Sequence, residues 1–192
     1  EPTLKARETT LEAVVERTGA TFIPPFDFLD VIEGQATCAL ELLEDQPDLD
    51  IVMAPVGGGG LLGGTALVAH YLNPKVKVIA GEPTGADDAF RSFHAGYIIP
   101  LEKTNTISDG LLTTVGKLNF ELIQKHVADI LLATDPQTIE AMRLIFERMK
   151  MVIEPSCAVP LAALLANKEC FAGKKVGIIL SGGNVDLGKL PF

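Results

Sequence analysis

Short apolar runs alternate along this chain with longer segments whose apolar positions recur at helical spacing. The runs predict strands at residues 21–23, 50–55, 76–80, 130–132 and 176–180. Helices are predicted at about 3–17, 30–45, 61–71, 89–95, 119–126, 135–150 and 160–166, and residues 98–116 look irregular. Short β-branched strands separated by helices are typical of a parallel sheet covered on both faces. The predicted fold class is therefore α/β, a three-layer parallel sheet between helices.

The stretch Val56-Gly57-Gly58-Gly59-Gly60 follows a buried strand and precedes a helix. Four residues without Cβ cost conformational entropy, so they require a reason. A strand, a glycine turn and a helix start direct several N–H groups at one point, where the helix dipole adds positive potential. The loop is predicted to cradle a phosphate, and a tight packing turn is the alternative.

Two further polar segments follow predicted strands, at residues 82–88 and 181–184. Ligands of open parallel sheets bind beyond the carboxyl ends of the strands. We therefore expect both segments to lie near the glycine loop, at one edge of the sheet.

Composition narrows the possible partners. The net charge of −9 over 192 residues argues against nucleic acid and against anionic membranes. No apolar run in the sequence reaches membrane-spanning length. The three cysteines, Cys38, Cys157 and Cys170, have no metal-ligand spacing and predict unpaired thiols in a reducing cytoplasm.

Four motifs occur here in a characteristic order. They are the tetraglycine loop, Ser108-Asp109-Gly110, Ile153-Glu154-Pro155-Ser156 and the stretch from Leu180 to Asp186. Together they resemble the pyridoxal-phosphate enzymes of the tryptophan-synthase-β fold type, and most closely the group of serine racemase and the short serine/threonine dehydratases. The resemblance covers essentially the whole chain and implies the C-terminal three fifths or so of such an enzyme.

The resemblance implies roles for individual residues. The backbone of Gly57, Gly58, Gly59 and Gly60 would bind the phosphate of pyridoxal 5′-phosphate. Ser181 would face the pyridine nitrogen, where a hydroxyl can donate to a neutral ring; a turn cap is the alternative. Gly110 would let its loop pass close to the ring, and Glu154 would lie at the ring edge or only brace the loop.

Arg7 and Thr113 are the candidate substrate contacts. Arg7 resembles an arginine of the family that meets the substrate carboxylate, although an exposed helical arginine remains the alternative. Thr113 stands where the racemase-like members have a serine near the substrate, so the hydroxyl is kept and a methyl group is added.

The segment from Glu82 to Asp88 resembles a divalent-cation site of the racemase-like dehydratases. Glu82, Asp88 and the Ala86 carbonyl would supply three oxygen ligands, and water would complete the shell of Mg²⁺, Ca²⁺ or Mn²⁺. A solvated acidic loop is the alternative.

The sequence also departs from the family pattern. Glu33 and Ala36 stand where an alanine and a glycine are usual in the linker motif. None of the lysines has the context of the family's Schiff-base lysine, so no catalytic residue is recognisable. The chain opens with Glu1-Pro2-Thr3, which is not a translation start, and we expect it to be part of a longer protein. Residues 1–27 would then end the small domain, and 28–192 would form the C-terminal part of the cofactor domain.

Three hypotheses follow for function. The first is that the chain is part of a pyridoxal-phosphate-dependent serine/threonine ammonia-lyase or serine racemase, which would act on L-serine, L-threonine or 3-hydroxyaspartate. The second is a non-catalytic module that binds a phosphate ligand, and the third is a β-replacement enzyme like cysteine synthase. The 82–88 and 181–186 segments favour the first over the third, and the family implies a homo-oligomer.

Overall fold

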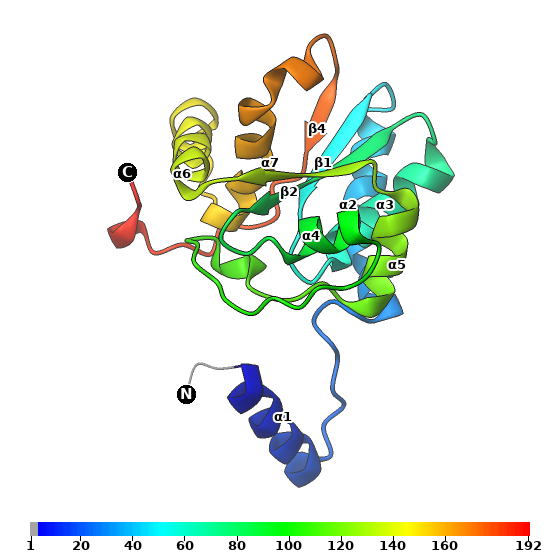
Figure 1. Ribbon diagram of the computed structural model, residues 1–192, viewed down its shortest axis with the longest axis vertical. Coiled ribbons are helices and arrows are strands. Elements are labelled where there is room, and N and C mark those ends of the chain that lie inside the picture. Colours follow the sequence, from blue (N-terminus) through cyan, green and yellow to red (C-terminus); the bar gives the residue numbers. More distant parts are fainter. Residues whose placement is uncertain (1–3) are drawn as a thin grey trace.

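The computed structural model describes residues 4–192. Four parallel strands form one sheet in the order β3-β2-β1-β4, with β1 (Ile51–Pro55) and β2 (Lys77–Pro83) at its centre. The outer strands are β3 (Asp129–Ala133) and β4 (Val176–Ile178). The sheet is the middle of three layers in Figure 1. The predicted α/β class with helices on both faces is confirmed.

The described residues form seven α-helices. They are α1 (Leu4–Thr18), α2 (Leu29–Asp45), α3 (Gly60–Leu72), α4 (Asp88–Ala95), α5 (Lys117–His126), α6 (Asp135–Leu144) and α7 (Pro155–Ala166). A π-helical segment, Ile145–Met149, extends α6, and short 3₁₀ turns lie at Asp109–Leu111, Lys168–Phe171 and Leu187–Lys189.

Alternate residues of β1 point to opposite faces of the sheet and build two separate cores. Val52 and Ala54 pack with α2, α3 and α5, whereas Ile51 and Met53 pack with α6 and α7. All five residues of β1 are buried, as expected for a central strand covered on both sides. The apolar run predicted as a buried strand therefore forms the centre of the molecule.

Three element predictions were wrong. Residues 21–23 form no strand, because the stretch from Gly19 to Phe28 runs as an extended connection from α1 to the body without a pairing partner (Figure 1). Helix α7 begins at Pro155 and not at Pro160, and Pro160 lies inside it. The predicted helix over 135–150 is α-helical only to Leu144, and the cap predicted at Thr3 lies outside the described residues.

The close approach of α7 to the sheet explains why its internal proline is tolerated. A Cβ on Gly81 of β2 would lie 2.7 Å from Cα of Pro160, so the helix rests directly on bare strand backbone. Pro155 at the first helical turn sets the start of the helix, since its ring has the helical φ and its missing N–H needs no partner there. Tertiary packing thus overrides the local helix-breaking tendency of Pro160.

Candidate cofactor site

The glycine loop forms one wall of a cavity of about 420 Å³ at the carboxyl ends of β1 and β4. Gly59 has a φ of 92° and precedes the first residue of α3, so the loop turns sharply into the helix. The backbone N–H groups of Gly57, Gly58 and Gly59 find no acceptor among residues 4–192, although all three residues are buried. Buried N–H groups without partners are rare, and here they lie at the N-terminus of a helix. The loop can therefore bind an anion.

The same glycines also make room for neighbouring side chains, which the sequence did not reveal. A Cβ on Gly58 would lie 2.5 and 2.6 Å from the two Cδ atoms of the Phe26 ring. A Cβ on Gly60 would lie 3.1 Å from the Phe26 carbonyl oxygen, and one on Gly59 would lie 2.9 Å from Cβ of Asn119. The glycines therefore have a role in packing, and this role is compatible with an anion bound by the same loop.

Asn119 and Asp27 fix the loop from outside the cavity. Asn119 donates from Nδ2 to the carbonyl oxygens of Gly58 (2.8 Å) and Phe26 (3.0 Å). The Asp27 carboxylate accepts from the backbone N–H groups of Lys117, Leu118 and Asn119, at the N-terminus of α5. Neither residue was predicted, because their partners lie more than 60 positions away in the sequence. The connection from α1 is thereby tied to the glycine loop.

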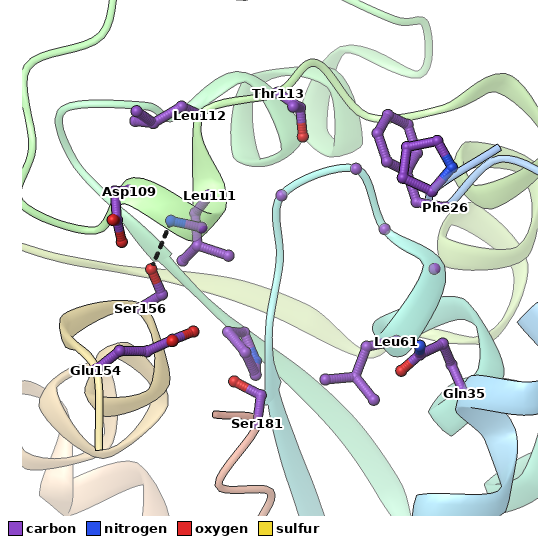
Figure 2. Close-up of a pocket in the computed structure, with 17 residues that line it drawn as sticks. Phe26, Gln35, Leu61, Asp109, Leu111, Leu112, Thr113, Glu154, Ser156 and Ser181 are labelled. Atoms are coloured by element: carbon purple, nitrogen blue, oxygen red, sulfur yellow. Dashed lines mark hydrogen bonds between the residues drawn. The ribbon is translucent and has the colours of Figure 1, made fainter. Parts of the chain in front are cut away.

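Ser181 and Glu154 lie on the opposite side of the cavity (Figure 2). The Glu154 N–H donates to the Gly182 carbonyl oxygen (3.1 Å), and its carboxylate accepts from the N–H of Asn184 (2.9 Å). A Cβ on Gly182 would lie 3.0 Å from the same carboxylate, so the loop after β4 passes close to it. Glu154 therefore both lines the cavity and braces the loop that carries Ser181.

Gly110 and Thr113 complete the predicted set. The Gly110 N–H donates to Oγ of Ser156 (2.9 Å), and the dashed line in Figure 2 marks this bond. A Cβ on Gly110 would lie 3.0 Å from the same oxygen, so only glycine fits there without displacing Ser156. Thr113 also lines the cavity. The structure thus brings together all the predicted cofactor residues and one of the two predicted substrate residues.

Several lining residues were missed from the sequence. The cavity is also lined by Pro25, Phe26, Gln35, Leu61, Asp109, Leu111, Leu112 and Ser156. Ser156 and Asp109 stand inside the motifs that carried the resemblance, and this position in the motifs could have marked them as lining residues. Arg7 belongs to α1, but its side chain lies outside the described residues. None of the described residues that line the cavity is a lysine.

The predicted cation ligands lie at the end of β2 and the start of α4. Glu82 and Asp88 have exposed fractions of 0% and 1%, and Ala86 is buried as well. A solvated acidic loop is therefore excluded. The Glu82 carboxylate accepts from the N–H groups of Ala89 (2.9 Å) and Phe90 (2.7 Å), and Asp88 Oδ2 accepts from Val115 (2.9 Å).

Neither of these two carboxyl groups forms a salt bridge in the described part of the chain, although the Arg91 guanidinium, which is paired with Asp87, attracts Asp88 as well. Burial raises the pKa of Glu82 to about 9 and that of Asp88 to about 6, and the neighbouring Asp87 adds to both shifts. Asp88 Oδ1 is buried and has no hydrogen-bond partner. Among the described residues there is no group of three or more His, Cys, Asp or Glu side chains suited to a metal. A cation here would depend on two carboxylates, a carbonyl and water, and the free Asp88 oxygen fits that donor set.

Comparison with known proteins identifies the family. Residues 1–182 match the family described as pyridoxal-phosphate dependent enzyme. The chain belongs to this family. Membership fits the cavity, because pyridoxal phosphate carries the phosphate that the glycine loop can hold.

Several members of the pyridoxal-phosphate dependent enzyme family are similar over nearly the whole chain. The β-hydroxyaspartate dehydratase of Paracoccus denitrificans (strain Pd 1222) is 49% identical, covering 100% of this chain and 61% of its own length. The serine racemase of Dictyostelium discoideum is 50% identical, and its crystal structure superposes with a TM-score of 0.90, covering 97% of this chain and 61% of the racemase. The threonine deaminase of T.th. is 42% identical, with a TM-score of 0.92 and coverage of 96% and 61%. The chain thus spans about three fifths of the length of these relatives.

In the described part of the chain, no helix is both long and apolar enough to cross a membrane. Cys38, Cys157 and Cys170 are unpaired, as predicted, with Cys157 buried and the other two exposed.

Proposed function

We propose that this chain is the cofactor-binding part of a pyridoxal-phosphate-dependent ammonia-lyase or racemase that acts on β-hydroxy amino acids. The substrate class would include L-serine, L-threonine and 3-hydroxyaspartate. The proposal rests on one observation. Three glycines whose N–H groups have no partner among the described residues line the same cavity as Ser181 and Gly110. Similarity to a β-hydroxyaspartate dehydratase, a serine racemase and a threonine deaminase supports the choice of reaction.

Each residue would have a separate task. The N–H groups of Gly57, Gly58 and Gly59 would bind the phosphate, with the N-terminus of α3 behind them. The Ser181 hydroxyl would hydrogen-bond to the ring nitrogen, and Glu154 would fix the loop that presents it. Thr113 would meet the substrate. When bound, pyridoxal phosphate supplies an electron sink that permits loss of the α-proton and then of the β-hydroxyl.

The Schiff-base lysine would come from polypeptide outside these 192 residues. This part of the proposal is supported by the lack of a lysine among the described residues that line the cavity. Arg7, on α1, would bring its guanidinium to the substrate carboxylate in the complete enzyme.

The two-domain division is also a proposal. Residues 1–27 would end a small domain, and 28–192 would belong to the cofactor domain. It is supported by the way α1 stands apart from the three-layer body and is joined to it by the extended 19–28 connection (Figure 1). Leu11 and Val15 of α1 and Phe22 of the connection line a second cavity of about 800 Å³. Its apolar lining suits contact with further polypeptide of the small domain.

We also propose a divalent cation bound by Glu82, Asp88 and the Ala86 carbonyl, with Mg²⁺, Mn²⁺ or Ca²⁺ as candidates. The support is the burial of two carboxyl groups that form no salt bridge among the described residues, together with the free Oδ1 of Asp88. A cation would remove their mutual repulsion and fix the end of β2 against α4, and it would thereby stabilise the fold.

Binding by the chain itself can be tested without the missing lysine. Pyridoxine 5′-phosphate has the ring and the phosphate but no aldehyde, so its affinity is independent of a Schiff base. We expect calorimetric titration to give one site per chain, and we expect Ser181→Ala to weaken binding while pyridoxine without phosphate fails to bind. Equal binding of both compounds would refute the phosphate cradle.

Activity requires the parent polypeptide that contains the lysine. We expect a visible absorption band from lysine-bound cofactor, and keto acid release from L-serine that falls when EDTA is added. Absence of the band would refute the enzyme assignment, and absence of an EDTA effect would refute the cation. Light scattering on the same sample tests the expected homo-oligomer.

A non-catalytic phosphate-binding module is the second candidate. The same absence of lysine from the described cavity lining favours it. It predicts that the parent binds pyridoxine 5′-phosphate and pyridoxal phosphate with equal affinity, because no covalent bond is formed. The enzyme proposal predicts tighter retention of pyridoxal phosphate.

A further inference from the structure

Two of the three histidines of the chain meet on the surface, far from each other in sequence. His70 lies in the last turn of α3, and His126 is the last residue of α5. The two helices pack against each other, and the imidazole ring centroids are 4.3 Å apart with an interplanar angle of 42°. His70 is exposed and His126 is half-buried, so the pair is open to solvent on one side.

The surroundings of the pair favour the neutral form of His126 and the approach of a cation. Burial, together with the nearby His70 and Lys125, lowers the pKa of His126 below its ordinary value. A neutral imidazole offers one ring nitrogen lone pair, and both rings stand at helix C-termini, where the helix dipoles favour positive charge. The Tyr71 ring lies edge-on to the His70 ring, with the two centroids 4.8 Å apart.

We propose that His70 and His126 form a two-histidine site for a divalent transition-metal ion of the Zn²⁺, Ni²⁺ or Cu²⁺ class. Imidazole nitrogen suits these ions, whereas Mg²⁺ and Ca²⁺ prefer oxygen ligands, so the site does not compete with the proposed cation at Glu82. Water completes the coordination shell on the exposed side. Neither histidine lines the cofactor cavity, because the pair sits at the end of α3 opposite to the glycine loop.

Such an ion would add a coordination link between α3 and α5 to the packing that they already have. Both helices also contact the glycine loop, α3 by beginning there and α5 through Asn119. Metal bound to the folded state alone would therefore raise the melting temperature of the layer that carries the loop.

The test is a Zn²⁺ titration of the complete 192-residue chain by calorimetry, with Cys38 and Cys170 replaced by serine. These two thiols are exposed and would otherwise bind the same ions. We expect one Zn²⁺ per chain, and we expect His70→Ala and His126→Ala each to weaken binding by about tenfold or more. Binding should also weaken as the pH falls through the histidine range, because protons compete for the same nitrogens.

His94→Ala is the matched control. Nδ1 of His94 is hydrogen-bonded to the Phe90 carbonyl oxygen (2.9 Å), and its ring packs on Phe90 and Phe93. We expect this variant, made in the same chain with Cys38 and Cys170 replaced by serine, to bind Zn²⁺ as that chain does. Absence of binding by the chain with all three histidines, or equal binding by its His70 and His126 variants, would reduce the pair to an aromatic contact and overturn the proposal.

A second measurement needs no histidine variant. In the NMR spectrum of the chain with Cys38 and Cys170 replaced by serine, substoichiometric Cu²⁺ should broaden the ring signals of His70 and His126 before those of His94. Uniform broadening of all three histidines would overturn the proposal as well.

Discussion

Replacement of Gly58 by alanine tests why the loop needs glycine at this position. Gly58 does not have a positive φ, so an alanine backbone is allowed there. The obstacle is Phe26, because the new Cβ would lie 2.5 and 2.6 Å from the Cδ atoms of its ring. Ordinary van der Waals contacts between carbons are about 3.5–4.0 Å, so the ring must move by about 1 Å or more.

The expected cost follows from this overlap. Overpacking of a filled site costs about 1–3 kcal/mol, and the ordinary benefit of replacing glycine by alanine, about 0.4–1 kcal/mol, does not offset it. We therefore expect Gly58→Ala to lower the free energy of unfolding by about 1–2 kcal/mol. Phe26→Ala removes the obstacle, so the double variant should be no less stable than Phe26→Ala alone.

Urea unfolding followed by far-UV circular dichroism measures all four members of this double-mutant cycle. The coupling between the two positions should be about 1–2 kcal/mol, and it should favour the double variant. Additive losses in the cycle would show that Phe26 is not the reason for glycine. Gly59→Ala is the control, because its φ of 92° makes alanine costly whether or not Phe26 is present.

Three other predictions concern the ends of helices and the cation. Thr134→Ala should lower the free energy of unfolding by about 1 kcal/mol in a urea titration, because Thr134 and Gln137 form a capping box on α6; no change would show that the cap contributes nothing. Asp27→Ala should cost about 1–2 kcal/mol because three N–H groups of α5 lose their acceptor, and Asp27→Asn should cost less because it keeps an oxygen; equal losses would contradict this account. Mg²⁺ should raise the melting temperature relative to EDTA, and Asp88→Asn should abolish this shift; a retained shift would remove Asp88 from the ligand set.

Local signals in the sequence predicted most of the elements. The apolar runs of β1, β2, β3 and β4 are short and each contains Ile or Val, so the length and composition of the runs sufficed to predict strands there. Thr21-Phe22-Ile23 has the same local pattern but no neighbouring strand among the described residues, and a strand requires a partner. The start of α7 was misjudged because Pro160 is a helix breaker locally, whereas its contact with Gly81 exists only in the folded chain.

The residues of the candidate site also fall into two groups, those with a local signal in the sequence and those placed by distant contacts. Gly57 to Gly60, Gly110 and Ser181 carry local signals, because glycine runs and turns after strands are visible in one dimension. Phe26 and Asn119 act on the loop through contacts that span 32 or more positions, so no local pattern could reveal them. The pairing of His70 with His126 was likewise invisible, since it depends on the way α3 packs on α5.

The strand order has a consequence for synthesis on the ribosome. β1 pairs with β4, and the two strands are separated by more than 100 residues of intervening chain. Because chains fold from the N-terminus as they emerge, β1 waits with one edge unpaired until β4 has left the exit tunnel. Ser181 follows β4 closely in the sequence, so the cavity is completed only after β4 has emerged. A nascent chain stalled before residue 176 would therefore present the glycine loop without the opposing wall, and it would offer the open edge of β1 to chaperones or to other nascent chains.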